Sequence, residues 1–83
     1  MINLKTKILF FKTNWCKHCS FMKKQLEGLN ENFEIIEFDY LKDKDVFLKY
    51  GITSFPTIII EKKDKIVKVL IGLQKKEILQ KYL

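Results

Sequence analysis

The chain has 83 residues, a net charge of +6 and a hydrophobic fraction of 47%. This composition excludes an intrinsically disordered chain, and the length fits one domain spanning residues 1–83. Its 16 basic residues are all lysines scattered among acids, so we expect a solvated basic surface and no nucleic-acid site, since arginine does much of phosphate and base recognition.

The first expected elements are a strand and a helix. Residues 7–13, "KILFFKT", form an apolar run that is typical of a buried strand. Cys19, Met22, Leu26 and Leu29 then recur at spacings of three and four, which place them on one helix face. The spacing predicts a helix over residues 16–29.

The next expected elements are a strand over residues 33–39 and a short helix. Ile36 and Phe38 are expected to share one face of this strand. The helix is expected to begin at a capping Asp43 or Asp45 and to end at Gly51.

Two further strands and a final helix complete the pattern. The β-branched run at residues 56–61 and the run at residues 66–72 flank the turn "KKDK", which predicts a hairpin. An apolar face predicts a helix from Lys75 to the end of the chain. The order βαβαββα predicts an α/β fold in which a parallel crossover unit and an antiparallel hairpin form a central four-stranded mixed sheet flanked by helices.

The stretch "WCKHC", Trp15–Cys19, contains both cysteines and the only histidine. Cys16 is expected at a helix N-terminus, where free N–H groups and the helix dipole favour a negative charge. A thiolate is the attacking species in disulfide exchange. Cys19, one turn further along, is expected to be shielded but within bonding reach, so the outer sulfur attacks and the inner one resolves.

The alternatives for the cysteine pair are a metal-binding site and a purely structural disulfide. A closed zinc site needs four ligands, whereas Cys16, His18 and Cys19 supply at most three. A disulfide that closes so small a loop restricts the unfolded chain little. We therefore expect no metal and no cofactor.

Three segments in this order resemble the thioredoxin superfamily: "FFKTNWCKHC", "YGITSFPTIII" and "IGLQKKEIL". The resemblance implies a thioredoxin-like fold whose redox pair is Cys16, the nucleophile, and Cys19, the resolving cysteine. It also implies a cis Phe55–Pro56 bond that faces Cys16. The residues implied to bind substrate are Trp15, Ser54, Phe55, Pro56, Ile71 and Gly72.

The sequence departs from the family at two places. Many thioredoxins carry a buried acid six residues before the nucleophile, where this chain has Phe10, and Glu37 is a candidate to replace it in moving the proton of Cys19. Lys17 and His18 stand between the cysteines, and we expect them to stabilise the Cys16 thiolate. The reduction potential is then expected to lie above thioredoxin's value of about −270 mV and below DsbA's value of about −120 mV.

The function expected from these features is thiol–disulfide exchange with proteins that bear disulfides, with a thioredoxin reductase-like enzyme or glutathione as electron donor. A glutathione-dependent, glutaredoxin-like enzyme is the alternative within the superfamily, although "IGLQKK" lacks the glycine pair and acid with which glutaredoxins hold glutathione. A module that binds a metal or an iron–sulfur cluster is the alternative from another class.

The apolar run at residues 8–11 is too short for a signal peptide or membrane span, which need roughly 7–15 and about 20 apolar residues. We therefore expect a cytoplasmic monomer that does not bind a membrane.

Overall fold

The computed structural model describes residues 6–29 and 33–83. The helices and strands follow the predicted order βαβαββα. In chain order they are β1 (Thr6–Lys12), α1 (Lys17–Glu27), β2 (Glu34–Asp39), α2 (Lys44–Tyr50), β3 (Thr57–Lys62), β4 (Lys65–Ile71) and α3 (Lys76–Gln80).

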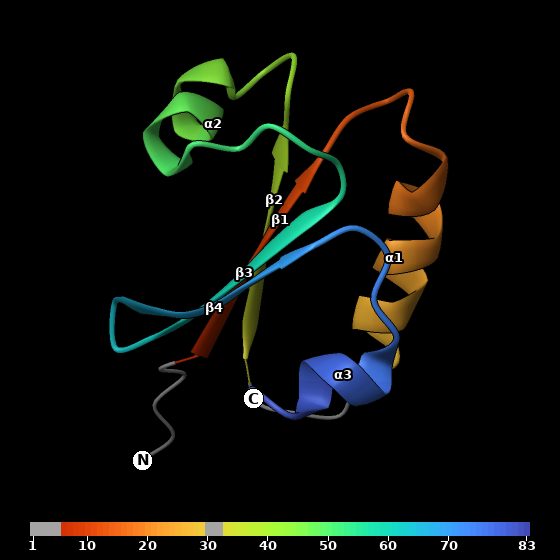
Figure 1. Cartoon of the computed structure of the whole chain (residues 1–83), viewed down its shortest axis with the longest axis vertical. Helices are drawn as coiled ribbons and strands as arrows, with labels where there is room; N and C mark the ends of the chain where they lie inside the picture. Colours follow the sequence, from red (N-terminus) through yellow and green to blue (C-terminus); the bar gives the residue numbers. More distant parts are fainter. Residues whose placement is uncertain (1–5, 30–32) are drawn as a thin grey trace.

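The strands form one mixed sheet in the order β2-β1-β3-β4 (Figure 1). β1 pairs in parallel with β2 and antiparallel with β3, and β3 pairs antiparallel with β4. A two-residue turn joins β3 to β4, and its residues Lys63 and Asp64 both have positive φ, at 53° and 65°. Such a turn matches the twist of a hairpin. The predicted four-stranded mixed sheet is confirmed.

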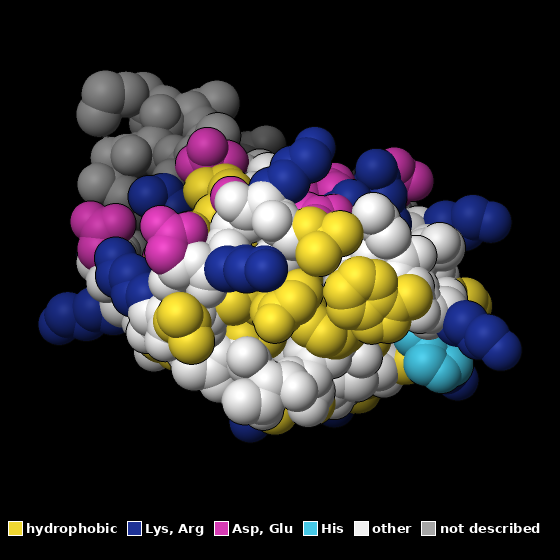
Figure 2. All heavy atoms as spheres, turned by 90° about the horizontal axis from the view of Figure 1, so that it is seen from above, with side chains coloured by type: hydrophobic (Ala, Val, Ile, Leu, Met, Phe, Trp, Pro, Cys, Tyr) yellow, Lys and Arg dark blue, Asp and Glu magenta, His cyan; other side chains and the backbone are white. Residues whose placement is uncertain are grey.

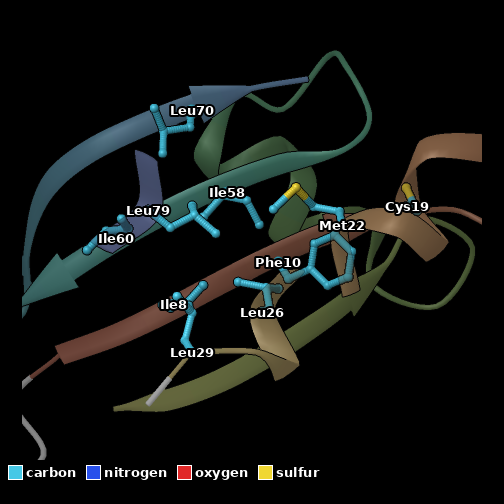
Figure 3. Packing of buried hydrophobic residues seen from close by; sticks show 10 residues of the cluster. All are labelled: Ile8, Phe10, Cys19, Met22, Leu26, Leu29, Ile58, Ile60, Leu70 and Leu79. Carbon is cyan, nitrogen blue, oxygen red and sulfur yellow. The ribbon is translucent and has the colours of Figure 1, made fainter. Parts of the chain in front are cut away.

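The two faces of the sheet carry separate apolar clusters because successive side chains of a strand point to opposite faces. On one face, Ile8 and Phe10 of β1 pack with Met22 and Leu26 of α1 and with Leu79 of α3 (Figure 3). On the other face, Leu9, Phe11 and Ile59 pack against Phe47 of α2. β1 is therefore covered on both sides, which explains its continuous apolar run.

The helix boundaries differ slightly from the predicted ones. Cys16 is the N-cap of α1, with an extended backbone, and α1 ends at Glu27 with Gly28 as C-cap. α3 ends at Gln80, and Tyr82 and Leu83 beyond it pack against the core as partly buried residues. Within the described ranges, no helix has the length and apolar character that crossing a membrane requires.

Asp43, one of the two predicted positions, is the N-cap of α2, and α2 ends at Tyr50 with Gly51 as its C-cap. The carboxylate of Asp43 does not cap the helix, because its Oδ2 accepts a hydrogen bond from the backbone N–H of Asp39 at 3.0 Å. It therefore fixes the chain where β2 ends.

Candidate active site

Cys16 lies at the junction between the loop that leaves β1 and the first turn of α1. Its backbone N–H donates a hydrogen bond to the carbonyl of Thr13 at 3.3 Å, and the N–H of Cys19 donates to the carbonyl of Cys16 at 3.4 Å. The two Sγ atoms are joined in a disulfide with a Cα–Cα distance of 5.4 Å. Cys19 is 5% exposed, whereas Cys16 is only half-buried. Of the two cysteines, Cys16 is therefore the one more open to solvent.

The start of α1 favours a negative charge on Cys16. The first turn of α1 contains no acidic residue, so its unpaired N–H groups and the positive end of its dipole are not offset there. Lys17 and His18 follow directly, and both side chains are exposed. A helix start of this kind favours the thiolate form of a cysteine.

The loop before β3 lies next to the exit of β4. The Phe55–Pro56 bond is cis, which confirms the prediction, and Pro56 is buried. The N–H of Gly72 donates a hydrogen bond to the carbonyl of Pro56 at 2.9 Å. The hydroxyl of Thr57 donates to the carbonyl of Ser54 at 2.7 Å, which holds the loop from within.

This loop and Cys16 also pack against the same part of the core. Phe55 and Cys16 are both partly buried and both pack against the apolar cluster under α1. Ile71, opposite Thr57 in the pairing of β3 with β4, is 62% exposed.

Trp15 lies at the surface rather than in the core, with 61% of it exposed. Its ring meets the ring of Tyr40 edge-on at a centroid distance of 6.1 Å, and Tyr40 in turn meets Phe55 at 5.7 Å. Figure 2 shows hydrophobic side chains gathered on this end of the molecule, with the histidine at the border of the patch and lysines around it. Trp15 and the loop at Phe55 thus belong to one aromatic surface.

Tyr40 is a residue of this surface that the sequence did not single out. It follows β2 directly, and its N–H donates a hydrogen bond to the carbonyl of Lys12 at 3.0 Å. Because parallel strands end at the same edge of a sheet, a residue just after β2 lies beside the loop just after β1. The parallel pairing of residues 7–13 with residues 33–39 was the signal that could have identified it.

Glu37 lies beside Phe10 in the pairing of β1 with β2, as a replacement for the missing acid requires. Its Oε1 is 2.8 Å from Nζ of Lys12, and its Oε2 is 3.7 Å from Nζ of Lys23. The hydrogen bond from Lys12 and the charges of the two lysines lower the pKa of Glu37, against a smaller opposing effect of burial. A proton-transfer group works best with a pKa near the operating pH. A lowered pKa therefore argues against Glu37 as the group that carries the proton, and its carboxylate pairs with the two lysines.

A family model described as "Thioredoxin" matches residues 2–83. This chain belongs to the thioredoxin family. The thioredoxin of Bacillus subtilis is 30% identical over 74 residues, which cover 84% of this chain and 71% of that protein.

Solved thioredoxin structures agree with the fold. A mutant thioredoxin from Halobacterium salinarum NRC-1 superposes with a TM-score of 0.87 at 20% identity, covering 93% of this chain and 70% of the other. The oxidised thioredoxin of Plasmodium falciparum gives a TM-score of 0.82 at 26% identity, covering 94% of this chain and 81% of the other. Together with the Cys16–Cys19 disulfide, family and fold make this thioredoxin-like chain a thiol–disulfide oxidoreductase.

Proposed function

We propose that this thioredoxin-like domain, residues 1–83, reduces or exchanges disulfide bonds of other proteins, with Cys16 as nucleophile and Cys19 as resolving cysteine. The observation that carries the division of roles is the contrast between a half-buried Cys16 at the start of α1 and a 5%-exposed Cys19 behind it. This contrast supports the sulfur of Cys16 as the one that meets a protein disulfide.

The reaction then has two steps. The Cys16 thiolate attacks one sulfur of the substrate disulfide, the substrate's S–S bond breaks, and its other sulfur leaves as a thiolate. Cys19 attacks the mixed disulfide at Cys16, which releases the substrate's second thiol and closes the Cys16–Cys19 bond. Two electrons pass from the enzyme dithiol to the substrate.

The substrate segment is proposed to lie along Trp15, Ser54, Phe55, Ile71 and Gly72, with the buried Pro56 supporting the loop beneath it. The exposure of Trp15 and Ile71 supports this role, as does the hydrogen bond between Gly72 and Pro56. Exposed aromatic and aliphatic side chains around a reactive group are typical of a protein-binding surface. Lys17 and His18 are proposed to tune the acidity of the thiol from the first turn of α1.

A thioredoxin reductase-like enzyme or glutathione is proposed to return the electrons, and the protein is proposed to act as a cytoplasmic monomer. Thiols in that compartment are normally kept reduced, which suits a dithiol that must be regenerated.

Single-cysteine variants test the roles of the two thiols. We expect reduced wild-type protein to reduce insulin disulfides, Cys16→Ser to abolish turnover, and Cys19→Ser to accumulate a mixed disulfide with the substrate, because the resolving step is removed. Non-reducing electrophoresis and mass spectrometry detect that adduct and its attachment site. Trapping by Cys16→Ser and not by Cys19→Ser would reverse the assigned roles, equal trapping by both would refute a division of roles, and insulin reduction by both variants would refute a two-cysteine mechanism.

A further inference from the structure

A polar hollow of about 280 Å³ opens between the end of β1 and α1, next to the disulfide. Its walls are formed by Phe10, Lys12, Thr13, Asn14, Cys16, Cys19, Ser20 and Lys23. None of these residues belongs to the loop at residues 54–56 or to the exit of β4 at residues 71–72. The hollow therefore shares Cys16 with the proposed protein-substrate site but lies away from the loop at residues 54–56 and the exit of β4, and its volume suits a small molecule rather than a polypeptide.

The charge of the hollow favours an anion. Lys12 and Lys23 contribute two ammonium groups, and the single carboxylate of Glu37 lies between them. The Nζ of Lys12 is 2.8 Å from the Glu37 carboxylate. The Nζ of Lys23 is 3.7 Å from the same carboxylate, and half of the Lys23 side chain is exposed. One positive charge remains uncompensated in this group, and the helix start at Cys16 adds to it.

The wall also offers groups that form hydrogen bonds. Asn14 and Ser20 are exposed on either side of Cys16. Thr13 is 4% exposed, and within the described part of the chain its hydroxyl has no hydrogen-bond partner. Because that oxygen is itself buried, the hydrogen-bonding groups open to a molecule in the hollow are those of Asn14 and Ser20.

We propose that this hollow binds a low-molecular-weight thiol that carries a carboxylate, and that such a thiol reduces the Cys16–Cys19 disulfide from there. The carboxylate would pair with Lys23, while the sulfur meets the disulfide in the same hollow. The inference rests on the proposed redox function, because it names the class of molecule that supplies the electrons.

The reduction balances with two molecules of thiol. The first thiolate attacks Sγ of Cys16, the more exposed sulfur; the Cys16–Cys19 bond breaks, and Cys19 leaves as a thiolate. A second thiolate attacks the small-molecule sulfur of the resulting mixed disulfide, which releases Cys16 and forms the oxidised small-molecule disulfide. Two thiols lose two electrons, the protein disulfide gains them, and the protein thiolates take up protons from solvent.

The test compares an anionic thiol with an uncharged thiol of the same shape. Oxidised protein is mixed with β-mercaptopropionate or with β-mercaptopropionamide, and Trp15 fluorescence follows reduction at several thiol concentrations. Rate constants are expressed per thiolate for each reagent. We expect the wild-type protein to prefer the anion about three- to fivefold, as a partly exposed ion pair allows, and added salt to remove the preference.

Two variants locate the effect. Lys23→Gln removes the cation from the hollow, and Lys24→Gln makes the same change of net charge at the next, exposed residue of α1, which does not line the hollow. We expect Lys23→Gln to lose the preference for the anionic thiol and Lys24→Gln to keep it. Equal losses in both variants, or no preference in the wild-type protein, would overturn the proposal.

A separate assay keeps this outcome distinct from the proposed function. Each protein is reduced with dithiothreitol, which is uncharged, and tested for reduction of insulin disulfides. Normal insulin reduction with no preference for the anionic thiol overturns the hollow as a thiol site and leaves the oxidoreductase function intact. Failure to reduce insulin overturns the proposed function itself.

Discussion

Lys17 and His18, the two residues between the cysteines, are both exposed in the first turn of α1. They are close to Cys16 along the chain, and we expect them to act on its thiolate and not on the disulfide. Stabilising the thiolate stabilises the reduced form, which raises the reduction potential.

Replacing His18 tests this effect. We expect His18→Ala to lower the reduction potential on the order of 30 mV, which corresponds to about 1.4 kcal/mol for a two-electron couple. The measurement is a titration of Trp15 fluorescence in defined glutathione buffers. Glu27→Ala, at the far end of α1, is the control and should leave the potential unchanged. A wild-type potential at or below thioredoxin's value of about −270 mV would contradict the role given to His18.

Residue types and their spacing were sufficient to predict some parts of the site. The helix-start position of Cys16 followed from the apolar spacing after it, and the resemblance supplied the cis bond before Pro56. The sequence did not predict that Tyr40 joins Trp15 to Phe55, because that contact depends on how β2 lies beside β1.

The surroundings of Glu37 could not be predicted for the same reason. Its neighbour Phe10 depends on strand register, and its contact with Lys23 depends on how α1 crosses the sheet. A shift of one residue would have placed Glu37 on the opposite face.

At the scale of the elements, two glycines end helices in different ways. Gly51 ends α2 with a φ of 67°, in the left-handed region, whereas Gly28 ends α1 with a φ of −82°. A Cβ at Gly51 would meet no atom within 4 Å, and a Cβ at Gly28 would meet its nearest neighbours at 3.6 Å, an ordinary contact. Both positions therefore have room for a Cβ, and they differ in the backbone angle φ that the substituted residue would have to adopt.

Alanine at these two positions is therefore a matched pair. We expect Gly51→Ala to lower the free energy of unfolding by about 1 kcal/mol, since a left-handed residue with a Cβ is strained. Gly28→Ala should leave it unchanged or raise it by about 0.5 kcal/mol, because alanine restricts the unfolded chain. Urea denaturation of both variants checks this, and equal losses would show that the backbone at Gly51 is not the cause.

The order and type of the elements could be predicted because each has a clear apolar period. Their ends were less certain, because local donors and acceptors compete there. Asp43 shows this: its position at the start of α2 was among those predicted, but its carboxylate binds the N–H of Asp39. The final helix is shorter than predicted, and Tyr82 reaches the core from beyond its end.

At the scale of the whole molecule, β4 is an edge strand with an apolar surface. Ile66, Val67, Val69 and Ile71 are each between 44% and 62% exposed. An exposed apolar edge can pair with another chain. Lys65 and Lys68 lie within β4, and Lys62 and Lys63 come just before it, so a second copy of this edge would bring like charges together.

The apolar edge of β4 and the repulsion between its lysines together predict that self-association of the protein depends on salt. We expect a monomer at low salt and weak self-association at high salt, because the screening length falls from about 10 Å at 0.1 M to about 3 Å at 1 M. Sedimentation velocity at the two salt concentrations measures this. Val69→Lys should remove the association at high salt, and a stable dimer at low salt would contradict the proposed monomer.

The proposed chemistry of the protein depends on a thiolate at Cys16 that the start of α1 stabilises. The most direct measurement is the rate at which iodoacetamide alkylates the reduced protein as a function of pH, with mass spectrometry to identify the modified cysteine. We expect modification at Cys16, while Cys19 stays unmodified, with a half-maximal rate well below pH 8.5, where a free cysteine is about half ionised. A half-maximal rate at or above that pH, or preferential modification of Cys19, would contradict a stabilised Cys16 thiolate and the exchange mechanism built on it.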